Sequence, residues 1–298
     1  MTTLVGSISA TSICDSISND GVRLLTIQYV APRSILAEIN THGMLSKNAR
    51  SSRAVPTKKL IEELKSNPYI PTFNGKNKPG MQAGDSINEA NRTELIASWL
   101  KMRDFTINEV ETMLATGNPH KQDINRALEP WMWVDGIITA TNWANFFALR
   151  DHEDAHPDFR TLAQCIIKEY SISQPKPLRR YQWHLPYVST EDYTRAGNMG
   201  TTYPNYSPLQ IVQLLSVART ARVSYKPFNG EDTIEAEMKR ANLLVNSGHW
   251  SAFSHQATPD YMVSGKWSQK DLHANFYGWC QLRKYFLNEN RQHHLSSL

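Results

Sequence analysis

Apolar and polar residues follow one another along most of the chain with the spacing of amphipathic helices. Apolar side chains recur every three or four positions, and a proline or a small polar residue often precedes the first turn. This pattern predicts helices over residues 32–40, 56–64, 88–103, 106–115, 120–128, 158–169, 209–222, 234–246 and 271–287. Residues 131–150 form the most apolar and aromatic stretch, and we expect a buried central helix there.

Strand-like segments are fewer. Residues 22–30 mix β-branched, aromatic and polar residues in partial alternation, which predicts a strand, and residues 181–188 have the composition of a strand or an extended arm. Clusters of Gly, Pro, Ser and Asn predict loops at 41–53, 67–84, 173–177, 197–208 and 249–259. The mixture indicates an α+β fold in which helix predominates.

The length of 298 residues allows a large core, in one elaborate domain or two small ones. Residues 1–20 are rich in Ser and Thr, and we expect a short ordered lead-in or a frayed tail. A first half at 21–196 and a second half at 197–298 are expected to meet at the Gly/Tyr/Pro-rich loop 197–208 and to pack as one compact domain.

The number and spacing of the cysteines indicate the redox state of the compartment. Cys14, Cys165 and Cys280 are far apart, their odd number argues against a disulfide framework, and none has the spacing of a zinc site. We therefore expect a reducing, cytoplasmic compartment and no metal. No apolar run approaches the roughly 20 residues of a membrane span, and the N-terminus lacks the basic start and apolar core of a secretory signal.

The net charge does not distinguish between the possible classes of ligand. The net charge of +4 and the pI near 8.8 fit an anionic small-molecule ligand as readily as nucleic acid. Basic residues are not clustered along the sequence, and a duplex backbone requires such a cluster. Nucleic-acid binding is therefore the most distant alternative.

Residues 41–53, T-H-G-M-L-S-K-N-A-R-S-S-R, are the strongest candidate for chemistry. Turn-favouring Ser, Asn, Thr and Gly surround one imidazole, His42, and two guanidinium groups, Arg50 and Arg53. Such a segment can offer backbone N–H groups, hydroxyls and fixed positive charge to a phosphate. The alternative is an ordinary polar surface loop after a helix.

This segment resembles the signature of the flavin-dependent thymidylate synthases, Arg-His-Arg-x-x-Ser-x-Asn-Glu-x-Ser-x-Arg. The residues that match are His42, Ser46, Asn48, Ser51 and Arg53. The chain departs at Thr41 and Gly43, where the family has arginines, and at Ala49, where it has glutamate.

Three further blocks resemble the same family. They are N-W-A-N-F-F-A-L-R at 142–150 with A-H-P-D-F-R at 155–160, A-R-V-S-Y at 221–225, and G-H-W-S-A-F-S-H at 248–255. In the ordinary family member the last two blocks come first. The chain therefore resembles a circular permutation of the family pattern.

The resemblance implies roles for individual residues. Those implied to bind dUMP are Glu38, Thr41, Ala49, Arg50, Ser51, Arg53, Arg126 and Arg150. Those implied to contact FAD are Thr41, His42, Gly43, Met44, Thr139, Thr141, Asn145, Ser224, His249 and Ser251. Ser51, Arg53 and Arg126 match the positions that hold the phosphate. Arg150 is implied to be catalytic, because it contacts the uracil ring and stabilises negative charge on it.

The activity implied is methylation of dUMP to dTMP. Methylenetetrahydrofolate supplies the carbon, and FAD reduced by NADPH supplies reducing power. No cysteine lies in a matched block, which agrees with a flavin route rather than a cysteine nucleophile. The family fold is an α+β core with a mixed sheet and long helices, in a homotetramer whose sites are shared between subunits.

The departures leave alternatives open. The loss of arginine at Gly43 removes a charge-assisted contact to flavin or folate, typically ~1.5–3 kcal/mol. Ala49 and Ser254 replace glutamates, so the pocket is less acidic than usual. A pocket retuned in this way could admit water and yield 5-hydroxymethyl-dUMP. A paralogue that binds nucleotide or a partner without catalysis is the second alternative.

Overall fold

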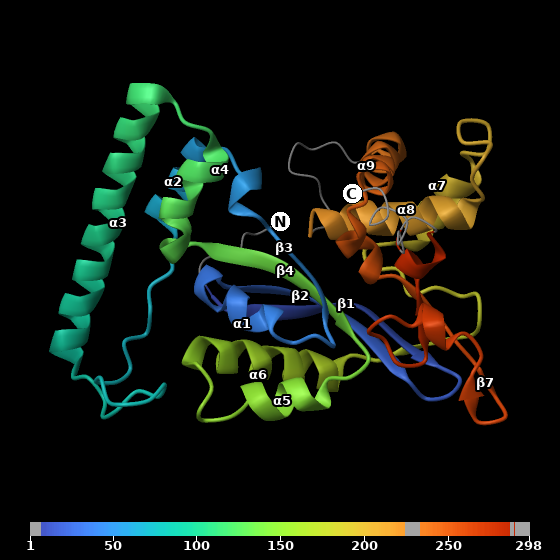
Figure 1. Ribbon diagram of the computed structural model, residues 1–298, viewed down its shortest axis with the longest axis horizontal. Coiled ribbons are helices and arrows are strands. Elements are labelled where there is room, and N and C mark those ends of the chain that lie inside the picture. Colours follow the sequence, from blue (N-terminus) through green and yellow to red (C-terminus); the bar gives the residue numbers. More distant parts are fainter. Residues whose placement is uncertain (1–6, 224–232, 287–288, 290–298) are drawn as a thin grey trace, which may run out of the picture.

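A mixed five-stranded sheet forms the centre of the molecule in the computed structural model, which describes residues 7–223, 233–286 and 289 (Figure 1). The strand order is β3-β4-β2-β1-β5. The strands are β1 (Ser9–Ser18), β2 (Arg23–Pro32), β3 (Ser46–Ala49), β4 (Trp133–Ala140) and β5 (Lys176–Leu178). The β1–β5 pair is parallel and the other pairs are antiparallel. The α+β fold and the mixed sheet are as predicted.

Helices surround this sheet. They are α1 (Leu36–Asn40), α2 (Thr57–Ser66), α3 (Glu89–Gly117), α4 (Lys121–Ile124), α5 (Ala144–Arg150), α6 (Pro157–Ile172), α7 (Thr190–Gly197), α8 (Pro208–Ala221) and α9 (Ile234–Ser247). Short 3₁₀ helices are η1 (Arg33–Ile35), η2 (Ser52–Ala54), η3 (Asn125–Trp131), η4 (Trp250–Ser254), η5 (Lys270–Leu272) and η6 (Leu282–Tyr285). Two small sheets pair β6 (Ala257–Pro259) with β9 (Trp279–Gln281), and β7 (Met262–Val263) with β8 (Lys266–Trp267).

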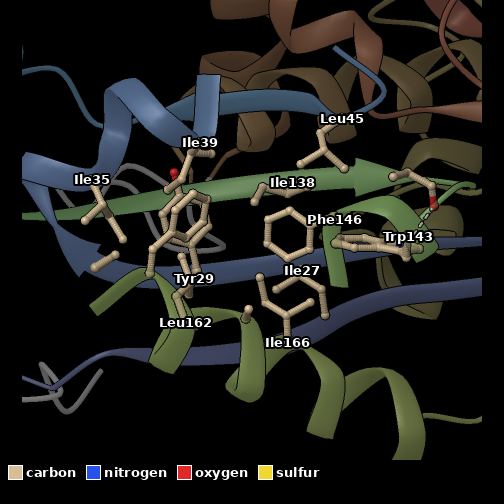
Figure 2. Close-up of a cluster of buried hydrophobic side chains, with 14 of the residues drawn as sticks. Ile27, Tyr29, Ile35, Ile39, Leu45, Ile138, Trp143, Phe146, Leu162 and Ile166 are labelled. Carbon is tan, nitrogen blue, oxygen red and sulfur yellow. Dashed lines mark hydrogen bonds between the residues drawn. The ribbon is translucent and has the colours of Figure 1, made fainter. Parts of the chain in front are cut away.

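Successive side chains of β2 point to opposite faces of the sheet and contribute to two separate hydrophobic clusters. Leu25, Ile27 and Tyr29 point to one face, where they pack with α5 and α6 in the cluster drawn in Figure 2. Leu24 and Thr26 point to the opposite face, which the C-terminal half of the chain covers. In Figure 1, α5 and α6 accordingly lie on the other side of the sheet from α8 and α9.

The expected central helix at 131–150 is wrong. Residues 133–140 are strand β4, which pairs with β2 and β3, and only 144–150 are helical. Most of the strand, including Ile137 and Ile138, is buried on both faces. A strand buried on both faces has a continuous apolar run, and periodicity alone cannot distinguish that run from a buried helix.

Other expectations also require correction. The two helices at 88–103 and 106–115 are one 29-residue helix, α3, because no breaking residue separates them. The last helix at 271–287 does not form: Gly278 takes a left-handed conformation with φ +71°, and β9 follows it. The loop 41–53 contains strand β3.

Three further segments, at 249–259, at 181–188 and at the N-terminus, differ from the expectations. Residues 249–259 are η4 and β6, which are largely buried, rather than a polar loop. Residues 181–188 hold only an isolated bridge between His184 and Ala257. The N-terminal segment, expected as lead-in or tail, is strand β1 over residues 9–18. Among the described residues, none of the helices is sufficiently long and apolar to cross a membrane.

Gly136 on β4 is fixed by its neighbour Tyr29. The two are register partners, and a Cβ at Gly136 would lie 2.1 Å from Cζ of the buried Tyr29 ring. We expect Gly136→Ala to lower the free energy of unfolding by about 1–3 kcal/mol through overpacking, measured by urea denaturation. Tyr29→Phe is the control: its hydroxyl has no partner among the described atoms, so its removal should be nearly neutral. A neutral Gly136→Ala would contradict this packing.

Candidate functional site

Arg150 and His42 meet although 108 residues separate them in sequence. Arg150 ends α5, and its Nε donates to His42 Nε2 at 2.8 Å. The guanidinium carbon lies 4.5 Å from the centre of the Phe159 ring, which belongs to α6. A cation over an aromatic face is stabilised by the ring quadrupole. The structure therefore fixes the side chain of the predicted catalytic arginine on two sides.

His42 is neutral in this arrangement. Burial, followed by the positive charges of Arg150 and Lys47, lowers the pKa of His42 to about 4. The rings of Phe146 and Phe159 hold the imidazole by edge contacts. Because Nε2 accepts from Arg150, the proton lies on Nδ1. His42 thus acts here as an acceptor that orients Arg150, not as a second cation.

Glu38 and Thr41 complete the group around Arg150. Nη1 of Arg150 donates to Glu38 Oε2 at 3.4 Å, and Nη2 donates to Thr41 Oγ1 at 3.5 Å. The Thr41 hydroxyl donates to the Glu38 carbonyl at 2.7 Å. A guanidinium has five N–H donors, and these contacts and His42 use three of them. Arg150 therefore keeps donors for a ligand, on a side chain that is 20% exposed.

A pocket of about 390 Å³ lies next to this group. It is lined by Gly43, Leu45, Ser46, Lys47, Ser251, Ser254, Ala274, Asn275, Arg283 and Lys284. Two predicted FAD positions, Gly43 and Ser251, share it. Lys47 joins the pocket to the arginine group, because its Nζ donates to the His42 carbonyl at 2.6 Å.

Three polar residues of the pocket lining, Ser46, Ser254 and Asn275, contact the buried side chain of Gln281. The two N–H groups of Gln281 Nε2 are shared among Ser46 Oγ at 3.2 Å, the Ser254 carbonyl at 3.0 Å and Asn275 Oδ1 at 3.0 Å. Asn275 in turn donates to the carbonyl of Met44 at 3.1 Å. Sequence reasoning identified neither Asn275 nor Gln281, because both lie in the C-terminal segment, outside every matched block.

Arg50 and the three predicted phosphate residues, Ser51, Arg53 and Arg126, lie at the opposite end of β3 from Arg150. Arg50 is engaged by Glu63, at 2.6 and 2.9 Å, and by Asp135 at 3.6 Å. Arg126 lies 3.7 Å from Glu129 and is well exposed. Ser51 and Arg53 are exposed on and beside η2, which packs against η3, the element that carries Arg126. Arg53 and Arg126 are therefore cations on neighbouring surface elements, whereas Arg50 is committed to ion pairs.

The remaining predicted positions are dispersed. Thr139 is fully buried, so its hydroxyl faces the interior rather than the pocket. Thr141 accepts from the backbone N–H of Tyr277 at 2.9 Å, and His249 Nδ1 lies 2.7 Å from Ser247 Oγ. Asn145 and Met44 are exposed, and Ala49 is half-buried in β3. Ser224 lies outside the described residues.

No protein-family model matches the sequence, and no curated protein matches it. Solved structures do. The chain is similar to the UMP/dUMP methylase PolB from Streptomyces cacaoi bound with 5-Br UMP, at 14% identity over 56% of this chain and 89% of PolB, with a TM-score of 0.47. It is also similar to the flavin-dependent thymidylate synthase ThyX from Helicobacter pylori complexed with FAD and dUMP, at 16% identity over 49% of this chain and 67% of ThyX, with a TM-score of 0.34.

A buried polar network joins the neighbouring strands β2 and β4 to two histidines from the C-terminal half of the chain. Thr26 and Thr139 are register partners whose hydroxyls lie 2.7 Å apart. Thr26 also bonds His184 Nε2 at 2.7 Å, and Thr139 bonds His255 Nδ1 at 2.8 Å. Burial lowers the pKa of both histidines to about 3. His255 is thus a neutral core histidine.

Among the described residues, Asp260, His273 and Cys280 form one group with three potential metal-ligand atoms within 4.8 Å of one another. The backbone N–H of Gly278 donates to His273 Nδ1 at 3.3 Å, so Nε2 carries the proton and donates to Asp260 Oδ2 at 2.8 Å. A metal would need a bare Nε2 and a donating Nδ1. Burial also raises the pKa of Cys280 to about 12. The arrangement is that of a structural Asp–His pair.

Proposed function

We propose that the chain is a flavin-dependent enzyme that methylates the uracil ring of dUMP. The observation that carries this proposal is the convergence of residues from separate matched blocks. His42 from the first block bonds Arg150 from the second, and Gly43 from the first shares a pocket with Ser251 from the last. Nothing in the packing of an ordinary surface loop requires such convergence.

The residues present fit FAD. The pocket of about 390 Å³ can hold the phosphate and ribose part of the cofactor, whereas the whole dinucleotide is larger. The hydroxyl, amide and cationic groups of the pocket can bind phosphate and ribose oxygens, and a Cβ at Gly43 meets nothing within 4 Å, so the backbone there is open to a ligand. When bound, the flavin, with NADPH as reductant, supplies the reducing power of the reaction.

Arg150 would act on the uracil. Its free N–H donors can bond the ring oxygen and nitrogen on which negative charge develops as C5 becomes nucleophilic. His42, Glu38 and the Phe159 ring hold the guanidinium in place before substrate arrives, so little reorganisation is needed during reaction. Methylenetetrahydrofolate would supply the carbon.

The cysteines support a route without a thiolate nucleophile. Burial raises the pKa of Cys14 and of Cys280 to about 12 and also raises that of Cys165. A thiol with a raised pKa is a poor nucleophile at neutral pH. None of the three lines the pocket.

Ser51, Arg53 and Arg126 would bind the phosphate of dUMP. They are exposed, at the other end of β3 from Arg150, with two cations that can reach a ligand. Exposure of this kind suits a site completed by another subunit, and we propose the homotetramer with shared sites that the sequence implied.

Product analysis tests the proposal. Purified protein is incubated with FAD, NADPH, labelled methylenetetrahydrofolate and either dUMP or UMP. The nucleotides are then separated, and their masses are determined by mass spectrometry. We expect label in a 5-methyl product, with UMP serving to define the sugar that is accepted. A 5-hydroxymethyl product would show that the protein is a dUMP hydroxymethylase instead. Absence of any labelled nucleotide with FAD bound would refute catalysis.

A further inference from the structure

The pocket beside Arg150 contains three cations, and two come from a segment that no motif covers. Lys47 belongs to β3, whereas Arg283 and Lys284 belong to η6 near the C-terminus. The last matched block ends at residue 255. The segment beyond it therefore contributes groups to the same pocket as the motif residues Gly43 and Ser251.

Neighbouring groups orient the two η6 cations. Arg283 Nη1 donates to Ser254 Oγ at 3.1 Å, and its Nε and Nη2 donate to Glu289 Oε1 at 2.9 and 2.6 Å. Lys284 Nζ donates to Glu289 Oε2 at 2.8 Å. The Glu289 side chain is 4% exposed, whereas those of Arg283 and Lys284 are 32% and 20% exposed, so the carboxylate is buried and the cations remain accessible.

Among the described residues in these contacts, positive charge predominates around the pocket. Glu289 is one carboxylate against the three cations Lys47, Arg283 and Lys284. Arg283 uses three of its five N–H donors in the contacts above, which leaves donors for an anion. A guanidinium held by a carboxylate and a hydroxyl is suited to bidentate recognition of a phosphate.

The position of Gly43 suggests what these cations replace. The matched motif has arginines at positions 41 and 43, and this chain has Thr41 and Gly43. Gly43 lines the pocket with Arg283 and Lys284, its φ is not in the left-handed region, and a Cβ there would meet nothing within 4 Å. A long side chain could therefore enter the pocket from Gly43, where none now does.

We propose that Arg283 and Lys284 bind the pyrophosphate of the flavin dinucleotide, in place of the arginines that the motif lacks. The proposal rests on the proposed function, because it assumes that the pocket takes FAD. The C-terminal segment then completes the cofactor site, and Glu289 serves to orient its two cations.

Binding measurements test this directly. FAD is titrated into the full chain and followed by flavin fluorescence at two salt concentrations, for the wild type, Arg283→Gln, Lys284→Gln and the control Lys270→Gln. Lys270 is an exposed cation of the same segment that does not line the pocket. For each pocket variant we expect the Kd for FAD to be 10- to 100-fold higher and to depend less on salt than in the wild type. For the control we expect an unchanged Kd.

A rescue variant separates charge from structure. Gly43→Arg in the Arg283→Gln background should regain most of the lost affinity for FAD, because it returns a guanidinium to the same pocket. Loss of binding with an unchanged salt dependence and no rescue would overturn the proposal, as would pocket variants that bind FAD like Lys270→Gln. Variants that bind FAD normally but lose methylenetetrahydrofolate would assign the cations to folate instead. A wild type that does not bind FAD would refute the proposed function itself.

Discussion

Replacement of Arg150 by glutamine is expected to reduce methylation of dUMP by about 100- to 1,000-fold, the usual cost of removing one preorganised group that stabilises developing charge. Glutamine retains hydrogen-bond donors but not the positive charge over Phe159 or the fork that meets His42. Arg150→Lys keeps the positive charge but loses the planar fork. We expect its kcat to lie between those of the wild type and of Arg150→Gln. The measurement is kcat and KM for dUMP with FAD saturating.

The matched control is Arg160→Gln. Arg160 is a more exposed arginine on the neighbouring helix α6, 3.5 Å from Asp151, and it does not line the pocket. We expect its kcat and KM to equal those of the wild type. If Arg150→Gln retained more than a tenth of the wild-type kcat while still folded, Arg150 would not be the group that stabilises charge on the uracil.

Acid is expected to unfold the protein steeply below pH 6.5, because His184 and His255 are buried in the neutral form. Their pKa values are about 3 in the fold and about 6.5 when unfolded, so the unfolded chain binds more protons between these limits. Stability is therefore complete above about pH 6.5 and lost as the pH falls. Two protons correspond to a slope of about 2.7 kcal/mol per pH unit. His42, with a pKa of about 4, adds to the same window.

Urea denaturation at a series of pH values measures that slope. The control His152→Gln changes an exposed histidine and should leave the slope intact. His184→Gln and His255→Gln should each reduce it by the contribution of one proton, about 1.4 kcal/mol per pH unit, whatever they do to stability at pH 7. Should a variant not fold, the wild-type slope still decides: stability independent of pH between 6.5 and 4.5 would mean that the histidines are not buried neutral.

The sequence predicted the α+β class and the regular helices because their apolar spacing and caps are local signals. α8 begins with a capping box at Ser207 and Gln210, and α9 ends at Gly248 in a left-handed conformation. It failed where tertiary context decides. The apolar run 133–140 becomes a strand only because β2 and β3 flank it. The run 271–287 is broken at Gly278, where a Cβ would lie 2.9 Å from the Trp267 ring.

The site shows the same division. The motif in 41–53 identified His42 and Gly43, and the second block identified Arg150, so the residues that meet could be named before the fold was known. That Arg50 is engaged by Glu63 and Asp135 could not, because ion pairing depends on distant elements. Arg283 and Lys284 had no sequence signal: they are two cations in a segment without a motif, and only the packing of η6 brings them to the pocket.

The most direct test of the central claim is the visible absorption spectrum of the purified protein with FAD, titrated with dUMP. If the matched blocks build one site, FAD binds near stoichiometrically and dUMP perturbs the flavin band, because the two ligands share a cavity. Arg150→Gln should still bind FAD but give a much weaker response to dUMP. Failure to bind FAD, or a flavin band that dUMP leaves unchanged in the wild type, would contradict the account.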